Sequence, residues 1–450
     1  MKPIGFDRPF LRRVLDIALP VTLQGLLQAS FSVVDQFMTG QLGTASVAGI
    51  GLGGQFAGLY TVVAAAVATG AGVMIAQYEG SRDETGTARS FWLHLALCLA
   101  IGGFFTVAAG GFTRPIMGLY TRESDVLEKA VLYLRALAPG FLPLALTDML
   151  STLLRCRGKA KIPLYASLAS AAANTALNWV LIFGHFGAPA LGVQGAAIAT
   201  SVARYVEMGA LVLYTLALSR RGAMHLPLAT GYPKTFLRQT AIILMPLLAC
   251  EFLWSLGQNA FGILYGQMGA APCAAMTLTN PIQTLTIGSL SGLSAAAGIL
   301  IGKRLGEGDR LATQQESVRL LWLGGIGSLL FSAAIALIAP LYVQLFNVED
   351  SVRSLTVTVL YAYALVAPFK VENMILEGGI LRSGGKTAFV MLIDLCTWIF
   401  GVPAGFAAGL WLHLPIAVTY FCLSLEECIR FAISLAVFQR GKWMQNLTAA

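Results

Sequence analysis

The chain has 450 residues, of which 56% are hydrophobic and only 12% charged, and its net charge at pH 7 is +8. A soluble domain carries about twice that share of charged residues, so the composition excludes a water-soluble globular fold. The basic excess forms no stripe interleaved with exposed aromatic residues, and we therefore expect no nucleic acid as a partner.

Apolar runs of roughly 20 to 30 residues follow one another along the whole chain, and each is long enough to cross a hydrocarbon layer of about 30 Å as a helix. Helices are expected because lipid offers backbone groups no hydrogen-bond partner. The predicted fold class is an all-α polytopic membrane protein with twelve transmembrane helices. These lie near residues 13–37, 45–78, 90–111, 127–154, 162–184, 192–219, 239–267, 273–303, 317–344, 353–381, 388–410 and 416–439.

The basic residues predict the orientation. Most of the 30 Lys and Arg side chains fall in the N-terminal tail, which includes Lys2, and in the even-numbered connections. The positive-inside rule then places both termini in the cytoplasm. The first apolar run is too long for a cleavable signal peptide, so we expect a multi-pass protein of the cytoplasmic (inner) membrane. The seven cysteines show no CxxC spacing, and we expect neither a zinc site nor a cofactor.

The sequence also repeats itself after 226 positions. Pro20 falls on Pro246 and Asp83 on Asp309, with no gap between the two matches. Each proline removes a backbone donor from the first helix of its copy and favours a bend there. Six spans per copy give both copies the same orientation, so the pseudo-twofold axis runs along the membrane normal.

The repeat predicts the domain organisation. We expect an N-lobe at 1–219 with helices 1–6, a cytoplasmic linker at 220–238 and a C-lobe at 239–450 with helices 7–12. A duplicated bundle has a natural cavity between its copies and can open it to each side in turn, as secondary transporters do.

Several motifs resemble those of the multidrug and toxic compound extrusion (MATE) transporters, especially the bacterial branches. They are Asp35 with the segment 37–43 (FMTGQLG), the loops 154–159 (LRCRGK) and 381–386 (LRSGGK), and the pattern from Asn174 to Asn178. The resemblance covers the whole chain. It implies two six-helix lobes in a monomer that exports amphipathic, cationic small molecules by antiport against H⁺ or Na⁺.

Asp35 is the clearest ionisable residue at membrane depth, in the outer half of the first span. Its repeat equivalent is Phe261, so only the first half has this carboxylate. The resemblance implies that Asp35 binds the coupling ion, with Asn174, Asn178 and Thr200 as neutral oxygen ligands. These hard ligands suit Na⁺, and the same carboxyl group could carry a proton instead.

The second half has its own acids, Glu251 near the midplane and Asp394 about 12 Å deep. Both lack an acidic repeat equivalent, and we expect them to form a carboxylate pair that exchanges a proton for a cationic substrate. Glu372 is either a partner of Lys370 or a further substrate carboxylate. The remaining candidates for this site, two amides and two aromatic rings able to meet a cation, are Asn259, Asn280, Trp254 and Trp398.

Other charges inside the spans have structural explanations. Glu426 and Arg430 are four residues apart, and Arg204 and Glu207 three, the spacings of helical ion pairs. We expect both to be structural pairs. Glu377 is expected to extend toward the nearby cytoplasmic face.

Two alternatives to drug export remain. A lipid or lipid-linked oligosaccharide flippase of the same superfamily would favour a cationic cavity, whereas the acids at depth argue for a cationic substrate. A membrane-embedded enzyme would need convergent histidines or a metal motif, and the four histidines are scattered.

Overall fold

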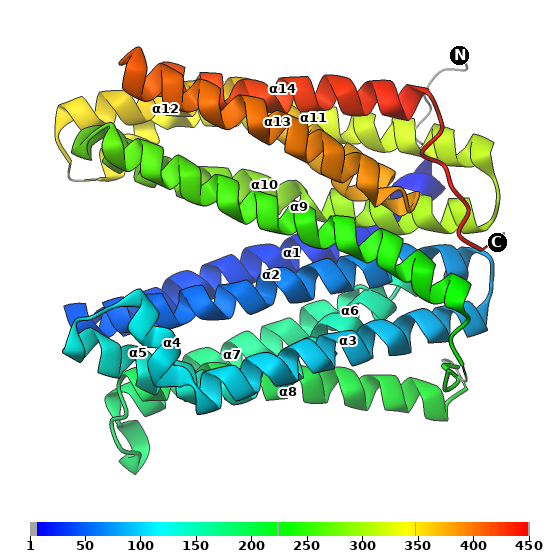
Figure 1. Cartoon of the computed structure of the whole chain (residues 1–450), viewed down its shortest axis with the longest axis horizontal. Coiled ribbons are helices and arrows are strands. Elements are labelled where there is room, and N and C mark those ends of the chain that lie inside the picture. Colours follow the sequence, from blue (N-terminus) through cyan, green and yellow to red (C-terminus); the bar gives the residue numbers. More distant parts are fainter. Residues whose placement is uncertain (1–6, 223–224, 230, 347, 449–450) are drawn as a thin grey trace. The chain divides into compact units, whose positions relative to one another are not determined.

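The computed structural model describes residues 7–222, 225–229, 231–346 and 348–448. Lys2 and parts of the predicted linker 220–238 lie outside the described residues. Figure 1 shows that long helices make up both halves of the chain.

The helices of the first half differ in length, and one short helix lies outside the predicted spans. They are α1 (Arg8–Gly40), α2 (Thr44–Gly80), α3 (Glu84–Gly111), α4 (Thr113–Tyr120), α5 (Ser124–Leu137), α6 (Phe141–Cys156), α7 (Lys161–Phe183) and α8 (Val193–Arg220), with 3-10 turns at Ala138–Gly140 and His185–Gly187. The span predicted at 127–154 corresponds to one candidate membrane segment, Ser124–Cys156, in which a 3-10 turn joins α5 and α6. Pro139 lies in the turn between α5 and α6, where a residue without an N–H interrupts the helical hydrogen bonds.

The second half contains two π-helical stretches, each continuing an α-helix. Its elements are α9 (Lys234–Gln267), α10 (Ala270–Gly306), α11 (Arg310–Tyr342), a 3-10 turn (Val343–Leu345), α12 (Asp350–Asn373), a π-helix (Met374–Leu381), α13 (Thr387–Phe406), a second π-helix (Ala407–Trp411) and α14 (Ile416–Gln439). Helix α9 thus begins inside the predicted linker, four residues before Arg238.

The predicted all-α membrane fold is confirmed. Eleven helical segments among the described residues are long and apolar enough to cross a membrane. The twelfth predicted span is α14, whose 24 residues include the charged side chains of Glu426, Glu427 and Arg430. These three charged residues distinguish α14 from the other eleven segments. Its 24 residues are still long enough to cross the membrane as predicted.

The internal repeat is visible in helix bounds and caps. Helices α2 and α10 both have 37 residues, and each end of α10 lies 226 positions after the matching end of α2. The Asp83 carboxylate caps α3 by accepting from the Gly86 amide at 2.9 Å, and Asp309 caps α11 through Ala312 at the same distance. The two halves therefore start their third long helix with the same capping bond.

Contacts divide the chain into two compact units. One comprises Met1–Thr22, Ala76–Ser81 and Lys234–Ala450, and the other comprises Leu23–Ile75 and Arg82–Pro233. The predicted lobes divided the chain only at the linker. The start of α1 and the end of α2 instead pack with the second half.

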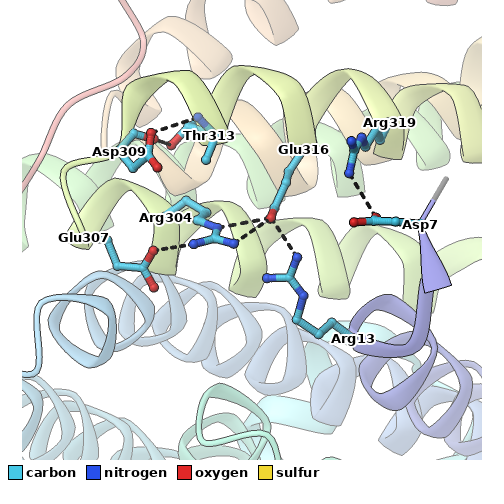
Figure 2. A network of polar contacts seen from close by, with 9 residues as sticks. Asp7, Arg13, Arg304, Glu307, Asp309, Thr313, Glu316 and Arg319 are labelled. Carbon is cyan, nitrogen blue, oxygen red and sulfur yellow. Dashed lines mark hydrogen bonds and ion pairs between the residues drawn. The ribbon is translucent and has the colours of Figure 1, made fainter. Parts of the chain in front are cut away.

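An ion-pair network holds the start of α1 in the first of these units (Figure 2). The buried carboxylate of Glu316 accepts from Arg13 Nη2 and from Arg304 Nη2, each at 2.9 Å. Arg304 also pairs with Glu307 at 2.7 Å, and Arg319 with Asp7 at 3.1 Å. The basic residues that predict topology thus also tie α1 to α10 and α11.

The end of α2 is held by a buried glutamine. Gln77 Nε2 donates to the Ser383 carbonyl at 2.6 Å and to the Gln445 carbonyl at 3.1 Å, and Gln77 Oε1 accepts from the Leu447 amide at 2.8 Å. Close helix packing adds to this, since a Cβ at Gly306 would overlap the Gln77 carbonyl. The segment after α14 is thereby part of the packed unit.

Candidate functional site

The first half places the four predicted ion-site residues on three helices. Asp35 belongs to α1, Asn174 and Asn178 to α7, and Thr200 to α8. The four-residue spacing on α7 puts the two amides one turn apart on one face. The three helices lie within one compact unit, apart from the start of α1.

These four side chains form one chain of hydrogen bonds. Asn178 Nδ2 donates to Asp35 Oδ1 at 2.5 Å and to Asn174 Oδ1 at 3.2 Å. Asn174 Nδ2 in turn donates to Thr200 Oγ1 at 3.3 Å. The residues that the sequence analysis grouped are therefore brought together, and their role as ion ligands stays a prediction.

The charge balance of this cluster is unusual. Asp35 is partly buried, and none of the ion pairs within the described residues involves it. Asn178 is fully buried, and its Oδ1 has no hydrogen-bond partner in the described part of the chain. A carboxylate, an amide oxygen and a hydroxyl are oxygen ligands of the kind that small hard cations prefer.

The second half contains a cavity of about 500 Å³. Five predicted residues line it, namely Glu251, Trp254, Asn280, Asp394 and Trp398. The cavity also has five charged lining residues that the sequence analysis did not assign to it, Lys370, Arg382, Glu426, Glu427 and Arg430. The side chain of Asn259 lies outside the described residues.

Each acid of the predicted carboxylate pair lies next to an arginine. Glu251 Oε1 lies 3.5 Å from Arg382 Nη1, and Asp394 forms an ion pair with Arg430. A guanidinium therefore lies against each acid of the predicted Glu251–Asp394 pair, and the role of this pair in exchanging a proton for a substrate stays a prediction. Such pairing offsets part of the cost of removing a carboxylate from water.

Arg430 also corrects two structural predictions. It bridges Asp394 and Glu377 rather than pairing with Glu426, and Ser434 donates a second bond to Glu377. Glu377 is only 1% exposed and does not reach the cytoplasmic face. Glu377 lies in the π-helix after α12, where the wider turn directs its carboxylate toward α14. A prediction based on α-helical spacing does not include this direction.

The predicted pair of Arg204 and Glu207 is also absent from the ion pairs of the described residues. Arg204 Nη1 instead donates to the Gly140 carbonyl at 3.3 Å, and its guanidinium lies 5.9 Å from the centre of the Phe141 ring. The break between α5 and α6 offers this carbonyl, and a long side chain reaches it in preference to its helical neighbour.

Glu372 lies apart from the cavity. It is 8% exposed, and its Oε1 has no hydrogen-bond partner among the described residues. A Cβ at Gly324 of α11 would lie 2.8 Å from that oxygen, so Glu372 faces bare glycine backbone. Lys370, the other partner considered, donates to Tyr420 instead.

The missed cavity residues had weak sequence signals. Arg382 follows a span in a predicted cytoplasmic connection, so its charge was explained by topology alone. Lys370 is a cation within an apolar run, which was the available signal. Neither pattern says which distant helix a long side chain will reach.

The MatE family profile matches residues 20–180 and 246–407, one segment in each half of the repeat. A probable multidrug resistance protein NorM of Thermotoga maritima is 24% identical, and the alignment covers 96% of this chain and 93% of that protein. The multidrug resistance protein PmpM of Pseudomonas aeruginosa is 23% identical over the same shares.

Solved structures share the fold at lower identity. A MATE crystal structure in the bent conformation superposes with a TM-score of 0.88 at 17% identity, covering 98% of this chain and 97% of that one. An outward-facing multidrug resistance MATE transporter of the MOP superfamily gives a TM-score of 0.85 at 17% identity, covering 96% of both chains. These likenesses confirm the predicted two-lobed fold.

Proposed function

The chain belongs to the MatE family, and from that premise we propose that it is a secondary active efflux antiporter. It exports amphipathic, cationic small molecules across a cytoplasmic membrane in exchange for H⁺ or Na⁺, with both termini in the cytoplasm. Its relatives are named as multidrug resistance proteins, so a transporter rather than an enzyme is supported, as predicted.

The observation that carries this proposal is the hydrogen-bonded chain from Asp35 to Thr200. Asp35 has no basic partner among the described residues, so its charge is open to a small cation or a proton. The unpartnered Oδ1 of Asn178 adds a neutral oxygen beside it. A buried carboxylate with neutral neighbours gains most from binding a single positive charge.

Coupling requires the ion to bind the two access states with different affinity, since equal binding shifts no equilibrium. Ion binding at Asp35 would replace the bond from Asn178 and alter how α1 meets α7. The acids of the second-half cavity would hold the substrate until the outward-facing state releases it.

The test is ethidium efflux from vesicles under an imposed H⁺ or Na⁺ gradient. Asp35→Asn should reduce gradient-driven efflux to background. Asp16→Asn is the matched control, because Asp16 lies on the same helix with an exposed side chain near Arg12. Efflux that stays at the wild-type rate in both Asp35→Asn and Glu251→Gln would refute the proposal, and varying Na⁺ at fixed pH identifies the ion.

The flippase alternative gains one observation, the three basic side chains of Lys370, Arg382 and Arg430 in the cavity. Two of them are neutralised by Glu251 and Asp394, which leaves no cluster of free cations for a pyrophosphate. A short-chain lipid pyrophosphate should therefore fail to displace ethidium. Displacement at micromolar concentration would favour the flippase.

A further inference from the structure

The basic residues of the cavity differ in whether they form an ion pair with a carboxylate. Arg382 and Arg430 each face a carboxylate, as described above. Lys370 does not, because no ion pair in the described part of the chain includes it. Of the three basic residues that line the cavity, Lys370 is thus the one without an ion pair in the described residues.

The surroundings of Lys370 are aromatic. Its Nζ lies 5.9 Å from the centre of the Tyr363 ring and 5.5 Å from that of Tyr420, within range of cation–π attraction. It donates to the Tyr420 hydroxyl at 3.3 Å, and that hydroxyl donates to Gln283 Oε1 at 3.4 Å. An ammonium group has three N–H donors, so two remain for a ligand.

Opposite charges lie in the same cavity on α14. Glu426 and Glu427 form no ion pair within the described residues, and the Glu427 carboxylate accepts a bond from Asn373 Nδ2 at 2.8 Å. Trp254 and Trp398 also line the cavity, and aromatic rings of this kind attract cations. The cavity therefore contains an ammonium group and two carboxylates that form no ion pair within the described residues.

We propose that this cavity takes zwitterionic amphiphiles, with the substrate's carboxylate bound by Lys370 and its amine held by Glu426 and Glu427. The Tyr363 and Tyr420 rings and Gln283 fix the ammonium group for this purpose. A substrate carboxylate would accept charge-assisted hydrogen bonds from the two remaining N–H donors of Lys370. The inference rests on the proposed export function and predicts that, among cationic substrates, those that also bear an acid bind more tightly.

A volume of about 500 Å³ suits a single drug-sized molecule, since such pockets span roughly 300–1,000 Å³. Both charge types lie in the wall of this one cavity, so one molecule can meet both. A purely cationic ligand would contact the acids and leave the two remaining N–H donors of Lys370 without an acceptor from the ligand. That difference predicts a preference between two ligands that differ only in the acid.

Rhodamine 110 and its methyl ester rhodamine 123 are such a pair, because the first is a zwitterion and the second a cation. Fluorescence polarisation with the purified full-length protein measures both dissociation constants at the same pH. Wild type should bind rhodamine 110 at least threefold more tightly. Equal binding, or tighter binding of the ester, overturns the inference without any variant.

The variant Lys370→Gln should weaken rhodamine 110 binding at least tenfold and change rhodamine 123 binding by less than about threefold. Lys370→Arg should restore most of the preference. Lys386→Gln is the control, since that lysine contacts Phe389 and does not line the cavity. An equal loss for both dyes would show a structural role and overturn the inference. Vesicles that move neither dye under a gradient would refute the export proposal instead, since the binding comparison stands by itself.

Discussion

The two halves of the repeat carry polar sites of opposite design. In the first half Asp35 accepts a hydrogen bond from the neutral amide of Asn178, and no guanidinium or ammonium group pairs with it in the described residues. In the second half, Glu251, Glu377 and Asp394 lie against arginines. The same scaffold thus supports a carboxylate without an ion pair at the first site and three carboxylates paired with arginines at the second.

Because of this difference, substitutions at the first site should affect ion binding, whereas substitutions at the second should affect stability. A carboxylate without a counter-charge is free to take a cation or a proton, and losing its charge leaves no other charge unpaired. A carboxylate in an ion pair stabilises its partner, and removing either leaves the other buried and alone. We therefore expect substitutions in the two sites to move different measured quantities.

The largest stability effect is expected at Arg430. Arg430→Met would leave Glu377 and Asp394 without their shared guanidinium, and breaking a buried pair in this way costs about 3–5 kcal/mol. Thermal unfolding in detergent measures it, with Arg440→Met near the end of the same helix as the control. Adding Glu377→Gln to Arg430→Met should recover part of the loss, and a variant as stable as wild type would break the comparison.

Asp35→Asn should have the opposite profile. Because no basic partner is left behind, its unfolding free energy should stay within about 1 kcal/mol of wild type, the range of a single neutral hydrogen bond. Ion-driven efflux should nevertheless be lost. A destabilisation as large as that of Arg430→Met would show that Asp35 is a structural charge.

The neutral oxygens of the first site should have smaller effects on coupling. Thr200→Val removes the hydroxyl that ends the hydrogen-bonded chain and should weaken the ion dependence of efflux about tenfold, or ~1.4 kcal/mol. Thr200→Ser keeps the hydroxyl and is the matched control. Equal activity of the valine and serine variants would exclude Thr200 from the site.

The smallest effect is expected at Glu372, an uncompensated acid in the second half. Its carboxylate faces Gly324 away from the cavity, so Glu372→Gln should leave dye binding unchanged and stability within about 1 kcal/mol. Equilibrium binding of rhodamine 123 together with thermal unfolding checks both. A tenfold loss of binding would place Glu372 in the substrate path.

Much of the fold was predictable because lipid permits few solutions. The lengths of the apolar runs predicted the helices. The 226-residue repeat predicted that α10 would have the same bounds as α2, shifted by 226 positions, and that Asp309 would cap its helix as Asp83 does. The 3-10 turn at Pro139 lies inside the span predicted at 127–154 and was not predicted, because the apolar residues on both sides form one continuous run.

The two sites differ in how much of them the sequence revealed. Asp35, Asn174, Asn178 and Thr200 were grouped through the family resemblance, and the structure brings them together. The ion pairs of Arg430 were out of reach because they depend on a π-helix and on a residue more than fifty positions away. Local spacing favours i and i+4 partners, whereas a buried guanidinium takes the nearest carboxylates in space.

An ion site in the first half that is distinct from a substrate cavity in the second predicts different effects of substitution at the two, and equilibrium ethidium binding as a function of Na⁺ and pH tests this most directly. In wild type, added Na⁺ or added protons should weaken binding. In Asp35→Asn, ethidium should bind as in wild type while this ion dependence disappears, and Glu427→Gln should instead lose affinity. An Asp35→Asn variant that keeps the full ion dependence, or that no longer binds ethidium, would contradict the separation.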